Sequence, residues 1–213
     1  MVKLVAFDVD GTLRDKEFMP DSTRGAIAEL QRRGIAVALC TGRSEYEMAP
    51  LCKELGIDWA VTCNGAHIGH RGATVLGTPF AREQVRSWLR TAEERGDTLL
   101  LYGAELMLTN RLDDPYFRRA QREIGFREPV LLQPGEEAPD IYQCIAFIGS
   151  EDEEAYVGDK KDRYYLHRWR DWAIDINPEG TNKAAGLRKL LTHLDLKAAE
   201  AAPSATVSTI WKC

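Results

Sequence analysis

Two aspartates stand at the end of a short apolar run near the start of the chain. Residues 4–7 form this run, Asp8 and Asp10 come next, and Gly11 and Thr12 follow. Carboxylates this close together at a strand end repel each other unless a cation joins them. A hard divalent ion with oxygen ligands, such as Mg²⁺, suits such a pair, so we predict Asp8 and Asp10 as metal ligands. The alternative is an Asp-x-Asp-Gly turn that only links a strand to a loop.

Thr41 lies at the end of a second apolar run, residues 35–40. If that run is a strand parallel to the first, its carboxyl end lies in the same crevice as Asp8. The Thr41 hydroxyl can then donate a hydrogen bond to a phosphoryl oxygen. The alternative is a threonine that helps to cap the helix predicted after Ser44.

Lys183 is placed by its sequence in the first turn of a late helix, where Leu187, Leu190, Leu191 and Leu194 share one face. A cation is unfavourable beside the partly positive N-terminus of a helix. Its position makes sense if an anion binds there, because helix N-termini collect phosphate. The alternative is an exposed surface lysine.

The segments that carry these residues alternate between strand and helix patterns. Strands are predicted at 4–7, 35–40 and 59–63, with helices after Pro20 and from Ser44 to about Leu55. Ser44 and Glu47 form a capping-box pattern, and Gly56 ends that helix. This alternation predicts an α/β fold with a doubly wound parallel sheet.

The pattern of predicted strands and helices changes after a linker at residues 77–82. Short strands and helices without strict β-α alternation then predict an inserted α+β module. We therefore expect a first domain built from residues 1–78 and 176–213, interrupted by a second domain at residues 79–175.

These motifs together resemble the haloacid dehalogenase (HAD) superfamily, in its Cof-type branch. Asp8-Val9-Asp10-Gly11-Thr12 matches motif I, the Thr-Gly-Arg string at 41–43 matches motif II, and Gly-Thr-Asn-Lys at 180–183 matches motif III. The Asn-Gly-Ala string at 64–66 resembles that branch too, although Asn-Gly alone is only a tight turn. The resemblance implies a Rossmann-like core and a cap domain that closes over the active site.

The resemblance also implies a magnesium-dependent phosphatase that works through an aspartyl-phosphate intermediate on a small phosphate ester, with a sugar phosphate as the expected class. Asp8 would be the nucleophile and Asp10 the general acid and base, with Mg²⁺ held by Asp8 and the Asp10 main-chain carbonyl. Thr41 and Lys183 would complete the catalytic set. The implied substrate-binding residues are Gly11, Thr12, Gly42, Arg43 and Asn64.

The family's fourth motif, a strand followed by Gly-Asp-x-x-x-Asp, has no match in this sequence, and no acidic residue follows Glu200. Residues 203–213 can, however, be encoded by codons that in a shifted frame spell FGDGLNDLEM, a family-type fourth motif. We therefore expect a frameshifted tail, with truncation or a divergent end as the alternatives, and sequencing the gene tests this. A missing metal ligand predicts little or no phosphatase activity for this chain, and an incomplete core predicts self-association.

Composition limits the other possibilities. The chain has 213 residues, is 44% hydrophobic and 29% charged, and carries a net charge of −5. An acidic balance gives no basis for nucleic-acid binding, and no apolar run reaches membrane-spanning length. The start of the chain shows no signal peptide, and the cysteine spacings match no zinc pattern, so we expect a cytoplasmic enzyme with reduced thiols.

Two other functions fit the same motifs. A phosphotransferase or phosphomutase would use the same residues, and a sugar acceptor that takes the phosphate in place of water would reveal it. A non-catalytic protein that binds a phosphorylated ligand would keep the pocket without turnover, although it has no need for a nucleophile such as Asp8.

Overall fold

The computed structural model describes residues 1–14, 18–133 and 135–204. Its α-helices are α1 (Asp21–Arg32), α2 (Glu45–Leu55), α3 (Arg82–Arg95), α4 (Pro115–Ile124), α5 (Glu154–Val157) and α6 (Lys183–His193). Its strands are β1 (Leu4–Phe7), β2 (Ala36–Cys40), β3 (Trp59–Thr62), β4 (His67–His70), β5 (Ala73–Gly77), β6 (Thr98–Tyr102), β7 (Met107–Thr109), β8 (Val130–Leu131), β9 (Gln143–Phe147), β10 (Tyr164–Arg170), β11 (Ala173–Pro178) and β12 (Ala201–Ser204). Short 3₁₀ turns are η1 (Cys63–Gly65), η2 (Ser150–Asp152), η3 (Gly158–Arg163) and η4 (Ala198–Glu200).

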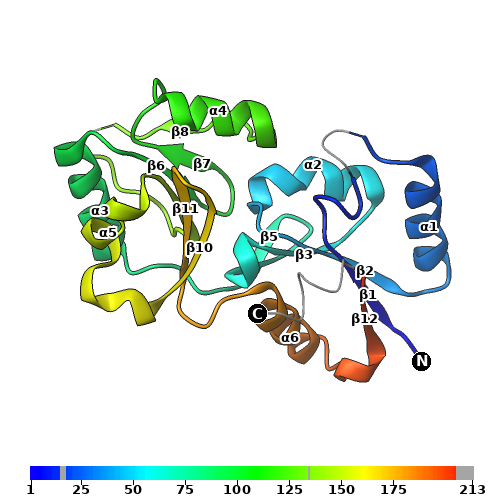
Figure 1. Cartoon of the computed structure of the whole chain (residues 1–213). Coiled ribbons are helices and arrows are strands. Elements are labelled where there is room, and N and C mark those ends of the chain that lie inside the picture. Colours follow the sequence, from blue (N-terminus) through cyan, green and yellow to red (C-terminus); the bar gives the residue numbers. More distant parts are fainter. Residues whose placement is uncertain (15–17, 134, 205–213) are drawn as a thin grey trace. The chain divides into compact units, whose positions relative to one another are not determined.

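The chain divides into two compact units, and the second is inserted into the first (Figure 1). The first unit comprises Met1–Gly77 and the segment that begins at Asn182, and the second comprises Thr78–Thr181. The sequence pattern places the second boundary after residue 175. The second unit extends further because β11 continues to Pro178 and pairs with β10 along its whole length.

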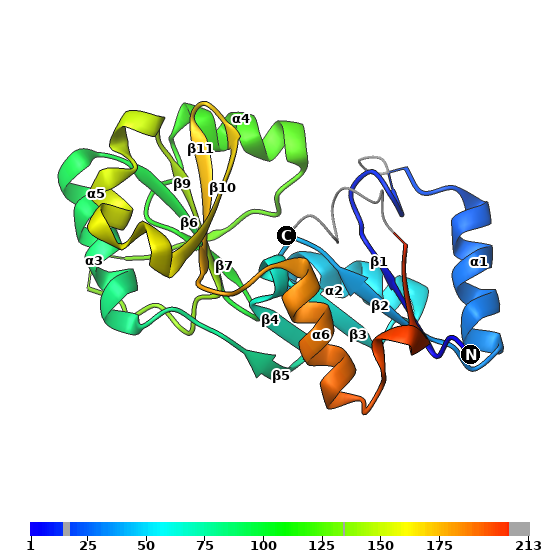
Figure 2. The same ribbon diagram turned by 60° about the horizontal axis from the view of Figure 1, so that its bottom comes forward.

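The first unit contains a sheet with the strand order β12-β1-β2-β3-β4-β5. The strands β12, β1, β2 and β3 are parallel. The helices α1 and α2 connect consecutive parallel strands on one face, and α6 packs on the other face (Figure 2). This arrangement confirms the predicted doubly wound α/β fold.

Alternation along β2 divides the core of the first unit into two clusters. Val37 and Leu39 pack with Ile27 of α1 and Met48 of α2. The intervening Ala38 and Cys40 pack with the leucines of α6. A strand that is apolar on both faces must be covered on both faces, which explains the continuous apolar run in the sequence.

The antiparallel strands β4 and β5 extend the sheet beyond β3, and the sequence pattern did not predict them. β4 pairs with β3 from Trp59↔His70 to Thr62↔His67. Its sequence, His-Ile-Gly-His, contains one large apolar residue and a glycine, so strand propensity is weak. Pairing with β3 therefore stabilises a strand whose own sequence has a weak preference for this conformation.

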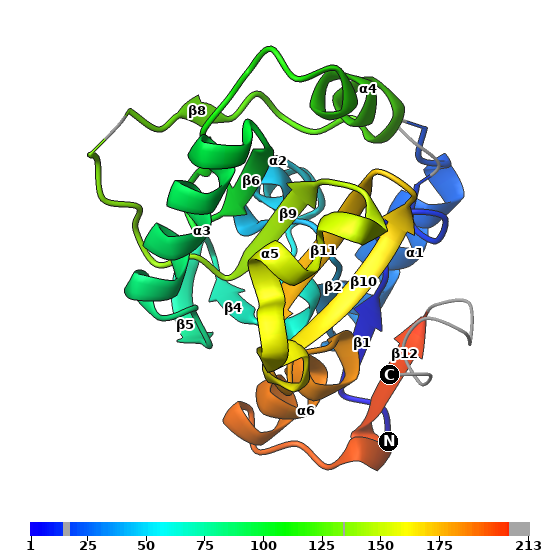
Figure 3. The same cartoon turned by 60° about the vertical axis from the view of Figure 1, so that its left-hand side comes forward.

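The second unit has its own sheet, with the order β10-β11-β9-β6-β7-β8. One face of this sheet, including Leu99, Leu101 and Ile174, packs on α3 and α5 (Figure 3). The Trp88 indole of α3 donates a hydrogen bond to the main-chain oxygen of Tyr156 in α5, with a distance of 2.7 Å. These features confirm the predicted α+β insertion.

Candidate active site

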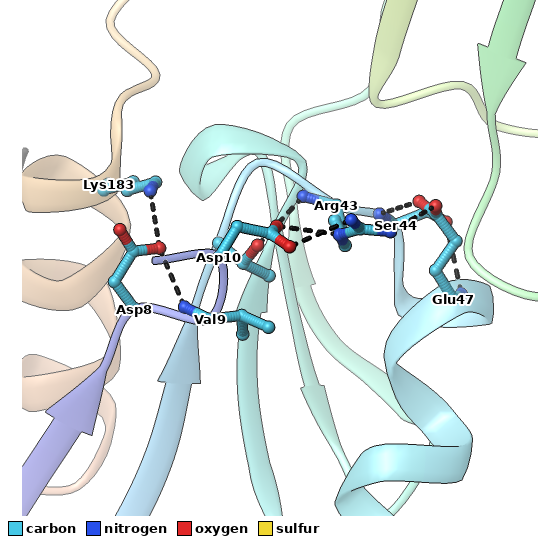
Figure 4. Close-up of polar contacts among 8 residues, drawn as sticks. Asp8, Val9, Asp10, Arg43, Ser44, Glu47 and Lys183 are labelled. Atoms are coloured by element: carbon cyan, nitrogen blue, oxygen red, sulfur yellow. Dashed lines mark hydrogen bonds and ion pairs between the residues drawn. The ribbon is translucent and has the colours of Figure 1, made fainter. Parts of the chain in front are cut away.

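Asp8 follows β1 directly and lies at the carboxyl edge of the parallel strands, where ligands of open α/β sheets bind. The residue is 5% exposed. Its Oδ1 atom accepts hydrogen bonds from the Val9 amide at 2.9 Å and from the Lys183 ammonium at 2.8 Å (Figure 4). Among the residues that the structure describes, none donates to Oδ2. The two donors therefore hold the carboxylate through Oδ1. The Oδ2 atom stays available to a ligand.

Lys183 is the first residue of α6, as the sequence predicted. The preceding Asn182 caps the helix, because its side-chain oxygen accepts a hydrogen bond from the Ala185 amide at 2.8 Å. The side chains of Lys183 and Asp8 are 13% and 8% exposed. Lys183 is therefore a partner of the Asp8 carboxylate and not an exposed surface lysine.

Close packing against the loop after β3 sets the position of α6. Asn64 and Gly65 have left-handed backbone conformations, with φ of 52° and 89°. A Cβ atom on Gly65 would lie 2.2 Å from the main-chain oxygen of Asn182, and one on Gly186 would lie 2.5 Å from the Cα of Gly65. Glycine is required at both positions because no side-chain atom fits between loop and helix.

Thr41 and Gly42 follow β2 at the same sheet edge. Thr41 is 1% exposed, and its amide continues the ladder to β3 by donating to the Val61 main-chain oxygen at 2.9 Å. The Thr41 hydroxyl oxygen accepts a hydrogen bond from the Arg43 amide at 3.1 Å. A Cβ atom on Gly42 would lie 2.9 Å from Oδ1 of Asn64, so the two predicted substrate-binding residues are close neighbours.

Asp10 forms a bidentate ion pair with Arg43 (Figure 4). The Arg43 Nε and Nη2 atoms donate to the two carboxylate oxygens at 2.8 and 2.9 Å. The Arg43 Nη1 atom donates to Glu47 at 3.4 Å, and Glu47 also accepts hydrogen bonds from the amide and hydroxyl of Ser44 at 3.0 Å each. One guanidinium group thus lies between two carboxylates.

The predicted substrate-binding residues Gly11 and Thr12 lie in a tight turn after Asp10. The Gly11 amide donates to the Arg14 main-chain oxygen at 2.8 Å, and the Thr12 amide donates to the Val9 oxygen at 3.3 Å. Both amides therefore already have partners within the loop. Gly11 has a φ of 74°, which explains the glycine in the motif.

Glu47 is a site residue that the sequence pattern identified only as a helix cap. The capping box of α2 is present with both of its hydrogen bonds. The same carboxylate also contacts Arg43, and burial raises its pKa while Arg43 and the Ser44 hydrogen bonds oppose this effect. A capping glutamate that also binds an arginine of a strand-end motif cannot be distinguished from an ordinary cap by spacing alone.

Cys40 lies next to the site but is not a nucleophile. Its thiol is fully buried and donates to the main-chain oxygen of Lys183 at 3.6 Å. Burial raises the pKa of Cys40 to about 12, and the Lys183 ammonium opposes this only in part. The thiol therefore stays protonated at neutral pH, as expected of a buried, unreactive cysteine.

The sequence model of haloacid dehalogenase-like hydrolases matches residues 5–202. The chain belongs to this hydrolase family. This membership confirms the resemblance inferred from the first three motifs. It also agrees with the β1 aspartate, the β2 threonine and the α6 lysine that the fold places at one edge of a single sheet.

Relatives of this HAD-like hydrolase include the candidate phosphatase YkrA of Bacillus subtilis (strain 168), which is 30% identical over 90% of this chain and 74% of that protein. An HMP-PP phosphatase of Yersinia pestis (strain Pestoides F) is 28% identical over 94% of this chain and 76% of that protein. The crystal structure of a hypothetical protein from Geobacillus kaustophilus HTA426 aligns with a TM-score of 0.84 and 32% identity, covering 95% of this chain and 79% of that one. In the part of this HAD-like hydrolase that the structure describes, no helix is both long and apolar enough to cross a membrane.

Proposed function

We propose that the chain is a magnesium-dependent phosphatase that hydrolyses a small phosphate monoester through an aspartyl-phosphate on Asp8. The observation that carries this proposal is the 2.8 Å contact between the Lys183 ammonium and the Asp8 carboxylate. A nearly buried lysine at a helix N-terminus offsets the repulsion between a carboxylate and an approaching phosphate dianion. The phosphatase names of two relatives support the same activity.

In the first step, an Asp8 carboxylate oxygen attacks phosphorus and the bond to the ester oxygen breaks. The Asp10 carboxyl gives its proton to the leaving alkoxide, so the alcohol departs neutral. In the second step, a water molecule attacks phosphorus, Asp10 takes the water proton, and the bond to Asp8 breaks. Phosphate leaves, and both aspartates return to their starting forms. Lys183 and the Thr41 hydroxyl hold phosphoryl oxygens throughout.

Magnesium ions in phosphoryl-transfer sites are bound by one or two carboxylates together with substrate phosphate oxygens and water. The Asp8 carboxylate and the Asp10 main-chain carbonyl supply such a partial set. Within the described residues, no group of three or more His, Cys, Asp or Glu side chains is arranged to hold a metal. Both donors are hard oxygen ligands of the kind that Mg²⁺ prefers, so they would hold an ion whose remaining ligands are substrate oxygens and water. Such an ion would supply charge stabilisation for the phosphoryl group when bound.

Residues 205–213, where a fourth motif would continue, lie outside the described residues. The loss of activity expected from the missing motif therefore stays a prediction. The test measures turnover of p-nitrophenyl phosphate with millimolar Mg²⁺ by the 213-residue chain and by a chain with FGDGLNDLEM in place of residues 203–213. We expect Asp8-dependent turnover with the shifted-frame tail and at least about tenfold less without it.

Three outcomes are decisive. Turnover that survives Asp8→Asn would refute the nucleophile. Failure of both chains to hydrolyse any of a panel of phosphate esters would refute the phosphatase. Robust, Asp8-dependent turnover by the 213-residue chain would confirm the phosphatase and refute the expected loss. Lys183→Met is expected to abolish activity, and Lys53→Met, at an exposed lysine in α2, serves as its control.

A further inference from the structure

The Arg43 guanidinium is directed at protein carboxylates, although its place in the Thr-Gly-Arg string predicts a substrate ligand. The side chain is 9% exposed, and its bidentate partner Asp10 is 48% exposed. Without a partner, an aspartate side chain this exposed would sample several rotamers, and a two-bond fork restricts it to one. The buried Arg43 therefore provides a rigid anchor for an exposed carboxylate.

Arg43 itself is held from both ends. Its amide donates to the Thr41 hydroxyl oxygen at 3.1 Å, and its main-chain oxygen accepts from the Cys63 amide at 2.9 Å. At the tip, Nη1 contacts Glu47, whose side chain is 1% exposed. Glu47 is fixed in turn by the capping box at the start of α2. Polar contacts therefore link the N-terminal cap of α2 to Asp10 through the Arg43 guanidinium group.

We propose that Arg43 and Glu47 are positioning residues, which orient Asp10 for proton transfer and do not bind the phosphate group. This inference rests on the proposed function, because it assigns Asp10 the role of general acid. It predicts a specific dependence on the leaving group. An alkoxide needs a proton in order to leave, whereas p-nitrophenolate is stable without one.

The kinetic test compares kcat/KM for glycerol phosphate and p-nitrophenyl phosphate in the full chain. We expect Asp10→Asn to lower the alkyl-to-aryl ratio by on the order of a hundredfold. Arg43→Lys, which loses the fork, and Glu47→Gln, which keeps the shape but weakens the contact with the Arg43 Nη1 atom, are each expected to lower it about tenfold. Because the readout is the ratio of kcat/KM between two esters, the test does not require a highly active enzyme.

Arg71→Lys is the matched control, because Arg71 forms the same kind of bidentate pair with Asp58 on the surface of the same unit, at 3.0 Å for both bonds. Its ratio is expected to equal that of the wild-type chain. Equal losses for both esters in Arg43→Lys, or an unchanged ratio in Glu47→Gln, would overturn the inference.

A binding test separates this inference from the proposed function. Calorimetry with inorganic phosphate and Mg²⁺ is expected to show at least tenfold weaker binding for Lys183→Met and less than twofold change for Arg43→Lys and Glu47→Gln. Weaker phosphate binding by Arg43→Lys would make Arg43 a substrate ligand and refute the positioning role. If neither the 213-residue chain nor the chain with the shifted-frame tail hydrolyses either ester, the proposed phosphatase is refuted, and the Arg43 binding result still decides the role of Arg43.

Discussion

Asp8 and Lys183 form the ion pair on which the site depends, and it differs from the many exposed pairs of this chain. Both side chains are mostly shielded from water, and they share one oxygen with the Val9 amide. Breaking a shielded pair leaves an uncompensated charge, which costs more than the pair itself contributes.

A double-mutant cycle tests this pair. Asp8→Asn and Lys183→Met are each expected to destabilise the fold, and the two together by less than the sum, with a coupling free energy of about 1–3 kcal/mol from urea unfolding. The exposed Arg71–Asp58 pair is the control and is expected to show much weaker coupling. Additive effects at Asp8 and Lys183 would mean that the contact contributes nothing to stability.

A second pair of residues, Glu45 and His67, is buried beside the site without belonging to it. The Oε2 atom of Glu45 lies 3.9 Å from Nδ1 of His67, whose ring nitrogens contact the hydroxyls of Thr62 and Thr74 at 2.9 and 3.0 Å. Burial raises the pKa of Glu45 to about 7 and lowers the pKa of His67 to about 4. The two groups therefore have opposite effects on stability as pH changes.

Between pH 4.5, the usual Glu pKa, and about 7, folded Glu45 binds more protons than it does in the unfolded chain. Its contribution to stability is therefore complete at low pH and is lost as pH rises through this window. His67 behaves in the opposite way, because between about 4 and 6.5 the folded imidazole binds fewer protons, so its contribution grows with pH.

Glu45→Gln removes the first of these effects. We expect its stability relative to the wild-type chain to improve by on the order of 3 kcal/mol between about pH 4 and pH 8, measured by urea unfolding. His67→Gln should change in the opposite direction over the lower part of this range. A Glu45→Gln difference that does not vary with pH would show that the carboxyl titrates normally in the folded chain.

At the scale of elements, the contact between η1 and α6 determines where Lys183 lies. Alanine at Gly186 would place its Cβ 2.5 Å from Gly65 and 2.6 Å from a Val61 methyl. The helix must move or the loop must distort, and overpacking of this kind costs about 1–3 kcal/mol. We expect Gly186→Ala to be destabilised in urea unfolding and to bind inorganic phosphate more weakly.

Gly25 in α1 provides the control for this substitution, because a Cβ atom at this position would meet no heavy atom within 4 Å apart from its chain neighbours and the backbone of its own helix. Gly25→Ala is expected to stabilise the fold by up to about 1 kcal/mol through helix propensity alone. If Gly186→Ala were stabilising to the same degree, the close approach between loop and helix would not control α6.

At the scale of the whole molecule, the second unit is a continuous segment with its own sheet and its own core. A fragment of residues 78–181 is therefore expected to fold by itself and to unfold cooperatively in urea, followed by circular dichroism. A fragment without a cooperative transition would show that the second unit depends on the first. The first unit is discontinuous, so no single cut yields it.

Self-association and the cytoplasmic location stay predictions. β12 is the terminal strand of the first sheet in the described residues and pairs on one side with β1. An unpaired strand edge is a surface to which another chain can add. Light scattering on the 213-residue chain measures this directly.

Local patterns were sufficient for much of the fold. The α2 capping box, its glycine end at Gly56 and the apolar strands β1 and β2 are all as predicted, because each depends on residues close together in sequence. The β4–β5 hairpin was not predicted, since its stability comes from pairing with β3. The predicted domain boundary after residue 175 also falls inside β11, whose last residues are held by pairing with β10 and not by an apolar pattern.

The sequence by itself determined the family, the α/β fold and the expectation that Asp8, Thr41 and Lys183 serve one site. It could do so because strand ends and helix starts are marked by local residue types, and parallel strands place their carboxyl ends at one edge. Only the tertiary structure decided which atoms pair: Lys183 with one Asp8 oxygen, and Asp10 with Arg43 backed by Glu47. Those pairings depend on how closely distant segments pack, as at Gly65 and Gly186, and no local periodicity encodes that distance.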